Sequence, residues 1–352
     1  MLRVGICRGL DGVRFLSRWQ EFLESLDCRV VISPGTHAGI IKSGVRLAPA
    51  ELCLPVKAFI GHALALRSEV DRLMVPRMVC VKPPVNGTNH RGRQRTARPG
   101  GWLFGCPKTI ALPDMLRALI PDLPPLVELR VDERERPERQ AYLELAAAVG
   151  ADRRKARAAL ARIQPPLGAG LGHDPISPSR NRSCPAPNRG RNVQKSAEEP
   201  DTRPVVALVG HEYLIDDEGL SLGLPGRVAE AGARVVRGYP PAGAANADRP
   251  GRSGSPAPIV PATPAFLPDW LYERELIEQA LAWAARPELD GLILAASFAC
   301  GTSAVTNEII RRTVARSRPG LAVMELMFDE QTGPAGLTTR LESFVELLRM
   351  GR

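Results

Sequence analysis

Three cysteines of the chain lie in short loops whose composition suits metal binding. Cys53 lies in Glu51-Leu-Cys-Leu-Pro-Val-Lys57, Cys106 in Phe104-Gly-Cys-Pro-Lys108, and Cys300 in Ser297-Phe-Ala-Cys-Gly-Thr302. A Pro or Gly lies within two residues of each cysteine, which indicates a turn rather than the middle of a helix or strand. Converging thiolates would repel one another by about 4 kcal/mol per pair at about 4 Å and an effective dielectric constant of about 20. We therefore interpret the three cysteines as thiolate ligands of one shared metal centre.

The same loops come before expected helices, which is a favourable place for a thiolate. Cys53 precedes a helix that begins near Lys57, and Cys300 lies between a buried strand over 291–295 and a helix over 304–316. Helix N-termini carry partial positive charge and free amide donors, so they stabilise thiolates. Ligands of open α/β sheets also gather beyond the carboxyl ends of the strands, where Cys300 is expected.

The other four of the seven cysteines are interpreted individually. In a long intracellular chain they argue against a disulfide framework. Cys7 in a strand, Cys28 at a helix-to-strand turn and Cys184 in a Pro-rich segment are expected to be unreactive. For Cys80, which follows a strand end, both a role as a ligand or near neighbour and simple burial stay open.

The hydrophobic pattern alternates between short apolar strands and amphipathic helices, which predicts βαβ units and parallel sheets. Two blocks repeat this plan, the first with strands over 2–7, 29–32 and 72–75 and the second with strands over 205–209, 234–236, 291–295 and 321–324. The expected helices cover 16–26, 57–66, 113–119, 137–163 with an interruption near Gly150, 224–231, 272–285, 304–316 and 339–350. The fold class is therefore α/β, with two doubly wound, Rossmann-like or flavodoxin-like parallel-sheet domains that face each other.

Biased segments separate and interrupt these blocks. We expect an N-terminal domain over 1–163 with a disordered basic loop near 84–100, a flexible Pro/Arg-rich linker over 164–203, and a C-terminal domain over 204–352 with a low-complexity loop near 240–268. The net charge of +9 is concentrated in the basic loop and the linker. Because no aromatic residues interleave with these charges, we disfavour nucleic-acid binding. Attraction of an acidic protein partner or of coenzyme A phosphates is as compatible with them, and a solvated loop without a role is the preferred interpretation.

The N-terminus places Arg3 and Arg8 around a strand-like run and lacks the apolar core of a signal peptide. No stretch approaches the roughly 20 apolar residues of a membrane span. A cytoplasmic protein without membrane attachment is expected.

The cysteine loops also carry a family resemblance. Together with Gly61-His62, Asp71 to Pro76 and the segment Asp329-Glu-Gln-Thr-Gly-Pro-Ala-Gly-Leu-Thr-Thr-Arg-Leu-Glu-Ser-Phe344, they resemble the acyl-CoA dehydratase activase-related proteins, which are similar to the D-component or 2-hydroxyacyl-CoA dehydratase subunit. The resemblance runs from Val4 to about Asp114 and from Val205 to the C-terminus. It implies an oxygen-sensitive 4Fe-4S cluster in a cluster-binding cleft, held by Cys53, Cys106 and Cys300 with an open fourth position. It also implies a separate ATP-hydrolysing activase as the electron donor, and a homodimer or heterodimer.

Some features depart from the pattern of that family. Gln331 stands where a His is expected, and Glu212 in Gly210-His-Glu-Tyr213 replaces an expected Pro, which weakens a proton-handling role for the Gln331 loop. A Cys-x5-Cys pair typical of double-cubane relatives is absent, which favours a single cubane. The chain also lacks a Gly-x4-Gly-Lys-Ser/Thr phosphate loop, so we expect no ATP hydrolysis by this chain itself.

Three functions stay open at this point. In the first, the cluster takes part in low-potential electron transfer or reduction; in the second, a dehydratase subunit uses the open iron as a Lewis acid on an acyl-CoA substrate. The third is a nonenzymatic adaptor that binds zinc, although the loops lack the paired Cys-x2–4-Cys knuckles of structural zinc sites. Residues expected to surround the ligands or line the cleft are Glu51, Lys57, His62, Lys108, Gly301, Arg340 and Glu342.

Overall fold

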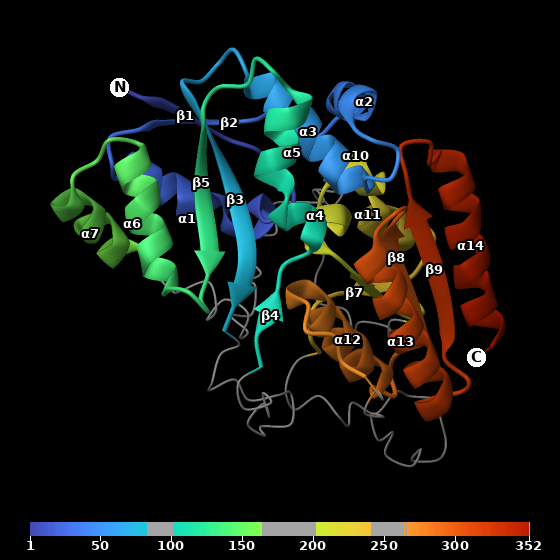
Figure 1. Cartoon of the computed structure of the whole chain (residues 1–352). Helices are drawn as coiled ribbons and strands as arrows, with labels where there is room; N and C mark the ends of the chain where they lie inside the picture. Colours follow the sequence, from blue (N-terminus) through green and yellow to red (C-terminus); the bar gives the residue numbers. More distant parts are fainter. Residues whose placement is uncertain (83–100, 164–201, 241–263, 265, 352) are drawn as a thin grey trace, which may run out of the picture.

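The computed structural model describes residues 1–82, 101–163, 202–240, 264 and 266–351, and it forms two α/β domains (Figure 1). The expected basic loop, nearly all of the expected linker and most of the low-complexity loop lie outside these residues. Among the helices described, none combines the length and the hydropathy needed to cross a membrane.

The first domain is built on a sheet in which three of the four strand pairings are parallel. The strands follow the order β2-β1-β3-β4, and β5 also pairs with β3. The two-residue strand β4 is antiparallel to β3, with Cys80 opposite Phe104. The elements are β1 (Arg3–Ile6), α1 (Gly12–Glu24), β2 (Arg29–Ile32), α2 (Ala38–Leu47), α3 (Leu54–Leu66), β3 (Arg72–Val81), β4 (Leu103–Phe104), α4 (Pro107–Ile110), α5 (Leu112–Leu119), β5 (Leu126–Asp132), α6 (Glu138–Ala148) and α7 (Arg153–Arg162).

The second domain is built on a wholly parallel sheet with the order β7-β6-β8-β9. Its elements are β6 (Val205–Gly210), α9 (Glu212–Ile215), α10 (Glu218–Ser221), α11 (Leu224–Glu230), β7 (Arg234–Val236), α12 (Leu271–Ala284), β8 (Gly291–Ser297), α13 (Gly301–Ser317), β9 (Ala322–Phe328) and α14 (Pro334–Met350). The strand order reverses between β6 and β8, which makes that boundary the topological switch point of the sheet.

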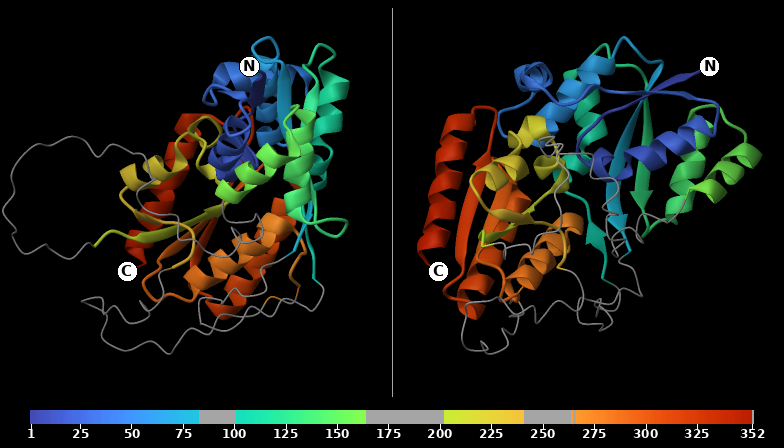
Figure 2. Two further views of the ribbon diagram at one scale, coloured as in Figure 1. Left: turned by 90° about the vertical axis from the view of Figure 1, so that its left-hand side faces the viewer. Right: turned by 180° about the vertical axis from the view of Figure 1, so that it is seen from behind.

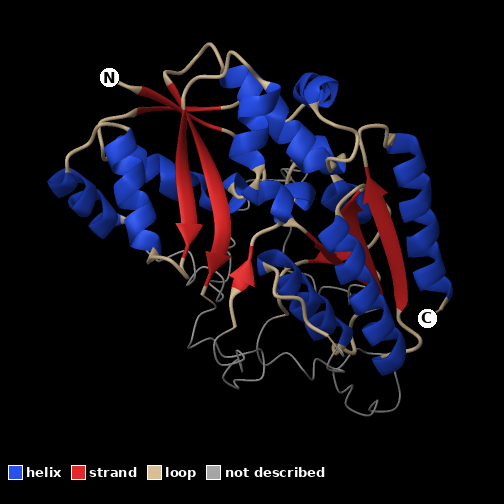
Figure 3. Ribbon diagram, in the orientation of Figure 1, coloured by secondary structure: helices blue, strands red, loops and turns tan. Residues whose placement is uncertain are grey.

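Each sheet is covered by helices on both faces (Figures 2 and 3). In the first domain, α1, α6 and α7 pack on one face, and α3 and α5 pack on the other. In the second domain, α12 and α13 cover one face while α11 and α14 cover the opposite one. The fold class predicted from the sequence, α/β with two parallel-sheet domains, is confirmed.

Helix α3 belongs to the cores of both domains. Its residues Phe59 and Ile60 pack in the first domain, whereas Leu54 and Ala58 pack among buried side chains of the second. Eleven of its residues are buried, which explains why the helix is apolar on all faces rather than amphipathic. The domains therefore share one hydrophobic element, and this element begins directly after Cys53.

Glycines allow α2 and α3 to cross at close range. A Cβ atom added to Gly44 would lie 1.8 Å from the main-chain oxygen of Lys57, and one added to Gly61 would lie 2.0 Å from that of Ile40. Only glycine fits at these two positions, so the Gly61-His62 motif has a packing role.

Candidate functional site

All three cysteines of the predicted site are the residues immediately before helices. Cys53 is the N-cap of α3, Cys106 of α4 and Cys300 of α13. A Pro in the first turn of α3 and α4 favours a helix start there, because its missing N–H would have no partner inside the helix. The helix expected near Lys57 therefore begins earlier than predicted, directly at the cysteine.

One lysine holds the three loops together. Lys108, two residues after Cys106, donates hydrogen bonds from Nζ to the main-chain oxygen of Glu51 at 2.6 Å and to that of Ala299 at 2.7 Å. The first acceptor belongs to the Cys53 loop and the second to the Cys300 loop. A further bond across the domains joins the amide of Leu54 to Ser297 Oγ at 3.0 Å. The three loops, which are distant in the sequence, therefore meet between the domains.

The three thiols also influence one another electrostatically. Burial first, and then negative charge on Cys300 and Cys106, raise the pKa of Cys53 to about 11, although the Val56 amide and Lys108 oppose this. Burial and the charge of Cys300 also raise the pKa of Cys106, against the backbone amides of Lys108 and Thr109. Cys53 is buried, whereas Cys106 and Cys300 are half-buried. If all three sulfurs were ionised, they would require a compensating cation.

Two kinds of metal group take three thiolate ligands, namely a single zinc ion and an iron–sulfur cluster. Within the described ranges, no three or more His, Cys, Asp or Glu side chains are grouped to hold a single metal ion. Tetrahedral zinc with bonds of about 2.3 Å would bring its sulfur ligands to about 3.8 Å from one another. A cubane cluster instead binds each cysteine through a separate iron atom, so its thiolates lie near one another without sharing one ion. Three thiolates are donors that zinc and iron–sulfur clusters both accept, so the donor set by itself does not choose between them.

Two of the residues expected around the cysteines, Glu51 and Lys57, take part in contacts between the domains. Glu51 contributes its main-chain oxygen to Lys108. Lys57 is only 4% exposed and donates from Nζ to Glu330 Oε1 at 2.8 Å, which links α3 to the loop after β9. Both residues thus stabilise the contact between the domains near the cysteines.

The other expected neighbours have contacts of different kinds. His62 lies nine residues beyond Cys53 on α3, about 14 Å along the helix, and its Nε2 is 3.0 Å from Thr36 Oγ1. Arg340 is exposed and donates to the main-chain oxygen of Glu325 in the middle of β9, and Glu342 is exposed on α14. A Cβ atom on Gly301 would meet no atom within 4 Å, so none of the described residues makes the close backbone approach expected there. None of these four residues is shown to contact the cysteine sulfurs.

A buried polar chain that was not predicted from the sequence leads to Cys300. His211 Nε2 is 3.1 Å from Glu273 Oε1, and His211 Nδ1 is 3.3 Å from Ser303 Oγ. Ser303 Oγ donates to Cys300 Sγ at 3.1 Å. His211 directly follows β6 and Cys300 follows β8, so both lie at the switch point of the second sheet. That position of a histidine at a strand end was the available signal.

Tyr213 lies between this chain and the cysteines. Its ring stacks on that of His211 with centroids 4.6 Å apart. Burial first, and then negative charge on Cys300, Glu273, Cys53 and Cys106, raise its pKa well above the usual value. The phenol is therefore neutral and near all three thiols.

A small cavity next to His211 lies between the domains. Its lining includes Leu10 and Arg14 from the first domain and His211, Tyr272 and Gln279 from the second.

Ion pairs close the domain contact around this cavity. Arg14 pairs with Glu212 at 2.7 Å and with Glu275 at 2.9 Å, and its guanidinium lies 5.0 Å from the centre of the Tyr272 ring. The Tyr272 hydroxyl in turn donates to Asp11. Glu212, noted in the sequence as a departure from the family pattern, is thus an anchor between the domains.

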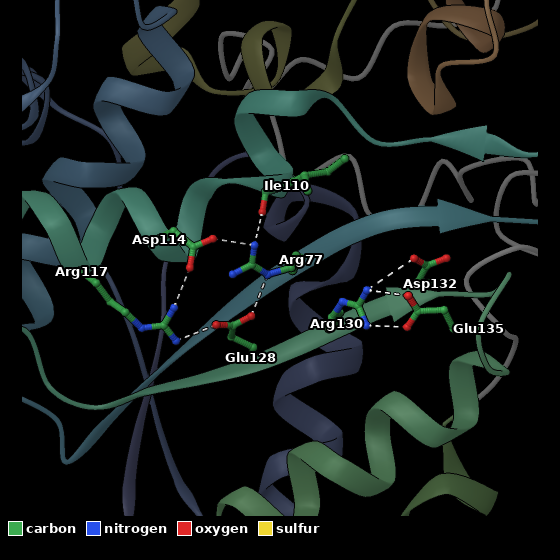
Figure 4. A network of polar contacts seen from close by, with 8 residues as sticks. All are labelled: Arg77, Ile110, Asp114, Arg117, Glu128, Arg130, Asp132 and Glu135. Carbon is green, nitrogen blue, oxygen red and sulfur yellow. Dashed lines mark hydrogen bonds and ion pairs between the residues drawn. The ribbon is translucent and has the colours of Figure 1, made fainter.

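A second ion-pair network fixes α4, the short helix that follows Cys106, to the first sheet (Figure 4). Arg77 on β3 donates to the main-chain oxygen of Ile110 at the end of α4 and to Asp114 on α5, at 2.7 and 2.8 Å. Its Nε also donates to Glu128 of β5 at 2.7 Å. The short helix that follows Cys106 is therefore fixed to the first sheet by one guanidinium group.

These features define a two-domain α/β protein with a three-cysteine site at the contact between its domains. Residues 3–163 match the family model described as CoA enzyme activase uncharacterised domain (DUF2229). The match confirms the predicted relation to acyl-CoA dehydratase activase-related proteins, and it covers the N-terminal domain. A search of the curated proteins found no match to this chain.

Gly105, next to Cys106, is predicted to be essential for the position of that loop. A Cβ atom there would lie 1.9 Å from the main-chain oxygen of Met78, whereas one on Gly301, next to Cys300, would meet no atom within 4 Å. We expect Gly105→Ala to lower the free energy of unfolding by about 1–3 kcal/mol or more, and Gly301→Ala to change it by less than about 1 kcal/mol. Urea denaturation of both variants measures this difference, and equal stabilities would contradict the assigned geometry.

His62 is predicted to make stability depend on pH. Burial first, and then the charges of Arg8 and His37, lower its pKa to about 4. His62 in the unfolded chain has a pKa of about 6.5 and therefore binds a proton more readily than in the folded protein. The free energy of unfolding is therefore highest above about pH 6.5, and it decreases as the pH falls to about 4. The loss should be about 3 kcal/mol and absent in His62→Gln, as measured by denaturation at several pH values. A variant with the same pH dependence as the parent would contradict this.

Proposed function

We propose that Cys53, Cys106 and Cys300 bind a 4Fe-4S cluster and that the protein is an iron–sulfur component of an acyl-CoA dehydratase system. In this role it receives an electron from a separate ATP-hydrolysing activase and passes it to a dehydratase component or a small substrate. The observation that supports the proposal most directly is the pair of Lys108 hydrogen bonds, which draws all three cysteine loops to one place.

A bound 4Fe-4S cluster would supply one-electron redox chemistry at a potential set by its ligands, hydrogen bonds and burial. The chain contributes the surroundings that control these factors. Cys53 is only 7% exposed and lies on the interior side, whereas Cys106 and Cys300 are half-buried and lie nearer to solvent. This asymmetry gives the site a closed side toward α3 and an accessible side toward α4 and α13, from which a partner or substrate would approach.

Positive and polar groups of the chain would offset the charge of the thiolates. The Lys108 ammonium and the first-turn amides of Val56 and Thr109 favour the thiolate forms of Cys53 and Cys106. Cys300 accepts a hydrogen bond from Ser303 and lies 3.5 Å from Thr302 Oγ1. Each sulfur is therefore matched with a donor or cation from its own helix start or a neighbouring loop.

Replacement of each of the three cysteines by Ala is predicted to remove most of the iron that the protein retains after anaerobic reconstitution. Cys28→Ala is the matched control, because Cys28 is also buried in the first domain but lies at a helix-to-strand turn away from the three loops. Iron and sulfide analysis with the visible absorption spectrum measures the outcome. Equal iron contents in Cys300→Ala and Cys28→Ala would refute the ligand assignment, and a colourless protein with stoichiometric zinc would refute the cluster.

Electron delivery is tested with the reconstituted protein and an activase under a low-potential reductant. We expect ATP-dependent bleaching of the visible absorbance, and no bleaching when a non-hydrolysable ATP analogue is used. Addition of a 2-hydroxyacyl-CoA separates electron transfer from dehydration, since formation of the enoyl product would identify the chain as a dehydratase subunit. Bleaching that does not require ATP would count against the activase as donor.

A further inference from the structure

The polar chain Glu273–His211–Ser303–Cys300 is continuous, and its first three members are almost fully buried. The exposed fractions are 3% for Glu273, 4% for His211 and 3% for Ser303. The successive contacts measure 3.1 Å, 3.3 Å and 3.1 Å. Water has little access to these groups, so the position of each proton in the chain is decided by the neighbouring side chains.

The Glu273 end fixes one of the two nitrogens of His211. Burial alone would raise the pKa of Glu273. Hydrogen bonds from His211 and Thr302 and the charge of His211 outweigh burial and lower the pKa below its usual value, so Glu273 is a carboxylate. A carboxylate is only an acceptor, and therefore His211 Nε2 must carry a hydrogen. In neutral His211 the other nitrogen, Nδ1, is then a bare acceptor that faces Ser303.

The Ser303 hydroxyl has a single hydrogen and two acceptors within reach. When His211 is neutral, Nδ1 and Cys300 Sγ compete for that hydrogen. When His211 is protonated, Nδ1 becomes a donor to Ser303 Oγ, so the hydroxyl hydrogen can only point to Cys300 Sγ. The protonation state of His211 thus decides how strongly the sulfur is hydrogen-bonded.

We propose that His211 is a positioning residue that couples one proton to one electron at the three-cysteine site, by turning the Ser303 hydroxyl toward the Cys300 sulfur. This proposal rests on the proposed iron–sulfur function. The electron comes from the separate low-potential donor. The proton comes from a hydronium ion of the solvent, whose O–H bond breaks as the N–H bond at His211 Nδ1 forms. No covalent bond other than that N–H bond forms in the protein, and the added charges of −1 and +1 cancel.

His211 lines the small cavity between the domains, and we expect the proton to reach its ring through this cavity. Of the charged groups nearby, Arg14 is already neutralised by Glu212 and Glu275, and Asp11 is bonded to Tyr272. Besides the cysteine thiols, the titratable groups that face the ring from packed elements are Glu273, Tyr213 and Tyr272. Glu273 is therefore the charged group directly paired with the ring.

The test measures the midpoint potential of the reconstituted protein as a function of pH. We expect an interval in which the potential falls by nearly 59 mV per pH unit, which corresponds to a tenfold change per unit for one electron. His211→Gln keeps both hydrogen-bonding ends of the side chain but does not titrate, so the slope should fall to less than about a third of that value. Ser303→Ala should lower the potential at acidic pH and reduce the slope, because a hydrogen bond to sulfur is lost.

His62→Gln is the matched control, since His62 is equally buried but contacts Thr36 rather than the cysteine site. This variant should retain the slope of the parent protein. A parent protein that carries iron but has a pH-independent potential, or a His211→Gln variant with the parental slope, overturns the inference while the iron–sulfur function stands. Failure of the protein to take up iron would instead overturn the proposed function.

A second measurement does not depend on iron. Nitrogen-15 spectra of the histidine side chains in the metal-free protein report which nitrogen carries the hydrogen. We expect neutral His211 to carry it on Nε2, and we expect Ser303→Ala to shift the Nδ1 resonance. A hydrogen on Nδ1 of neutral His211, or an Nδ1 resonance that ignores the loss of Ser303, would overturn the assigned hydrogen-bond directions.

Discussion

The Lys108 ammonium group is the interaction on which the site depends. It lies on a four-residue helix that would have little stability alone, yet it donates to the carbonyl groups of Glu51 and Ala299, which precede Cys53 and Cys300. Arg77 holds the far end of the same helix through the carbonyl of Ile110. The Cys106 segment is thus fixed at both ends by cations, one to the sheet of its own domain and the other to the contact between domains. Burial and mutual repulsion oppose ionisation of the thiols. The bonds of Lys108 and Arg77 therefore supply the favourable interactions that hold the cysteine loops together.

Helix α3 makes that contact between domains obligatory. Leu54 and Ala58 are part of the hydrophobic core of the second domain, so separating the domains would expose apolar surface on both. The same helix carries the buried Lys57, whose charge would be costly in an apolar contact without Glu330. Breaking such a pair typically leaves an uncompensated charge at a cost of several kcal/mol. The helix that begins after Cys53 is therefore held by apolar packing and by charge, which ties the position of Cys53 to the second domain.

Much of the fold follows from local pattern, but the site follows only in part. Apolar runs such as 205–209 and 291–295 identify their strands because parallel strands are buried on both faces. Strand β5 was not predicted, although Val127, Leu129 and Val131 alternate with charged residues as in a half-buried strand. The structure shows that the charges of Glu128 and Arg130 pair on one face of the sheet. The cysteine loops could be chosen from their turn residues. Glu273 could not be connected to His211, because 62 residues separate them and no local pattern encodes that contact.

The family match covers only two of the three cysteines of the predicted site. The matched residues 3–163 contain Cys53 and Cys106 but not Cys300. The third cysteine of the predicted site and the polar chain beside it therefore lie in the domain outside the match. That domain places His211 and Cys300 at the ends of neighbouring parallel strands, where the reversal of strand order leaves room for polar groups. The first domain therefore contributes the buried Cys53 and the Lys108 bridge, while the second contributes the half-buried Cys300 and the hydrogen bonds to its sulfur. The place where the three cysteine loops meet is thus built by the two domains together, and neither sheet alone contains it.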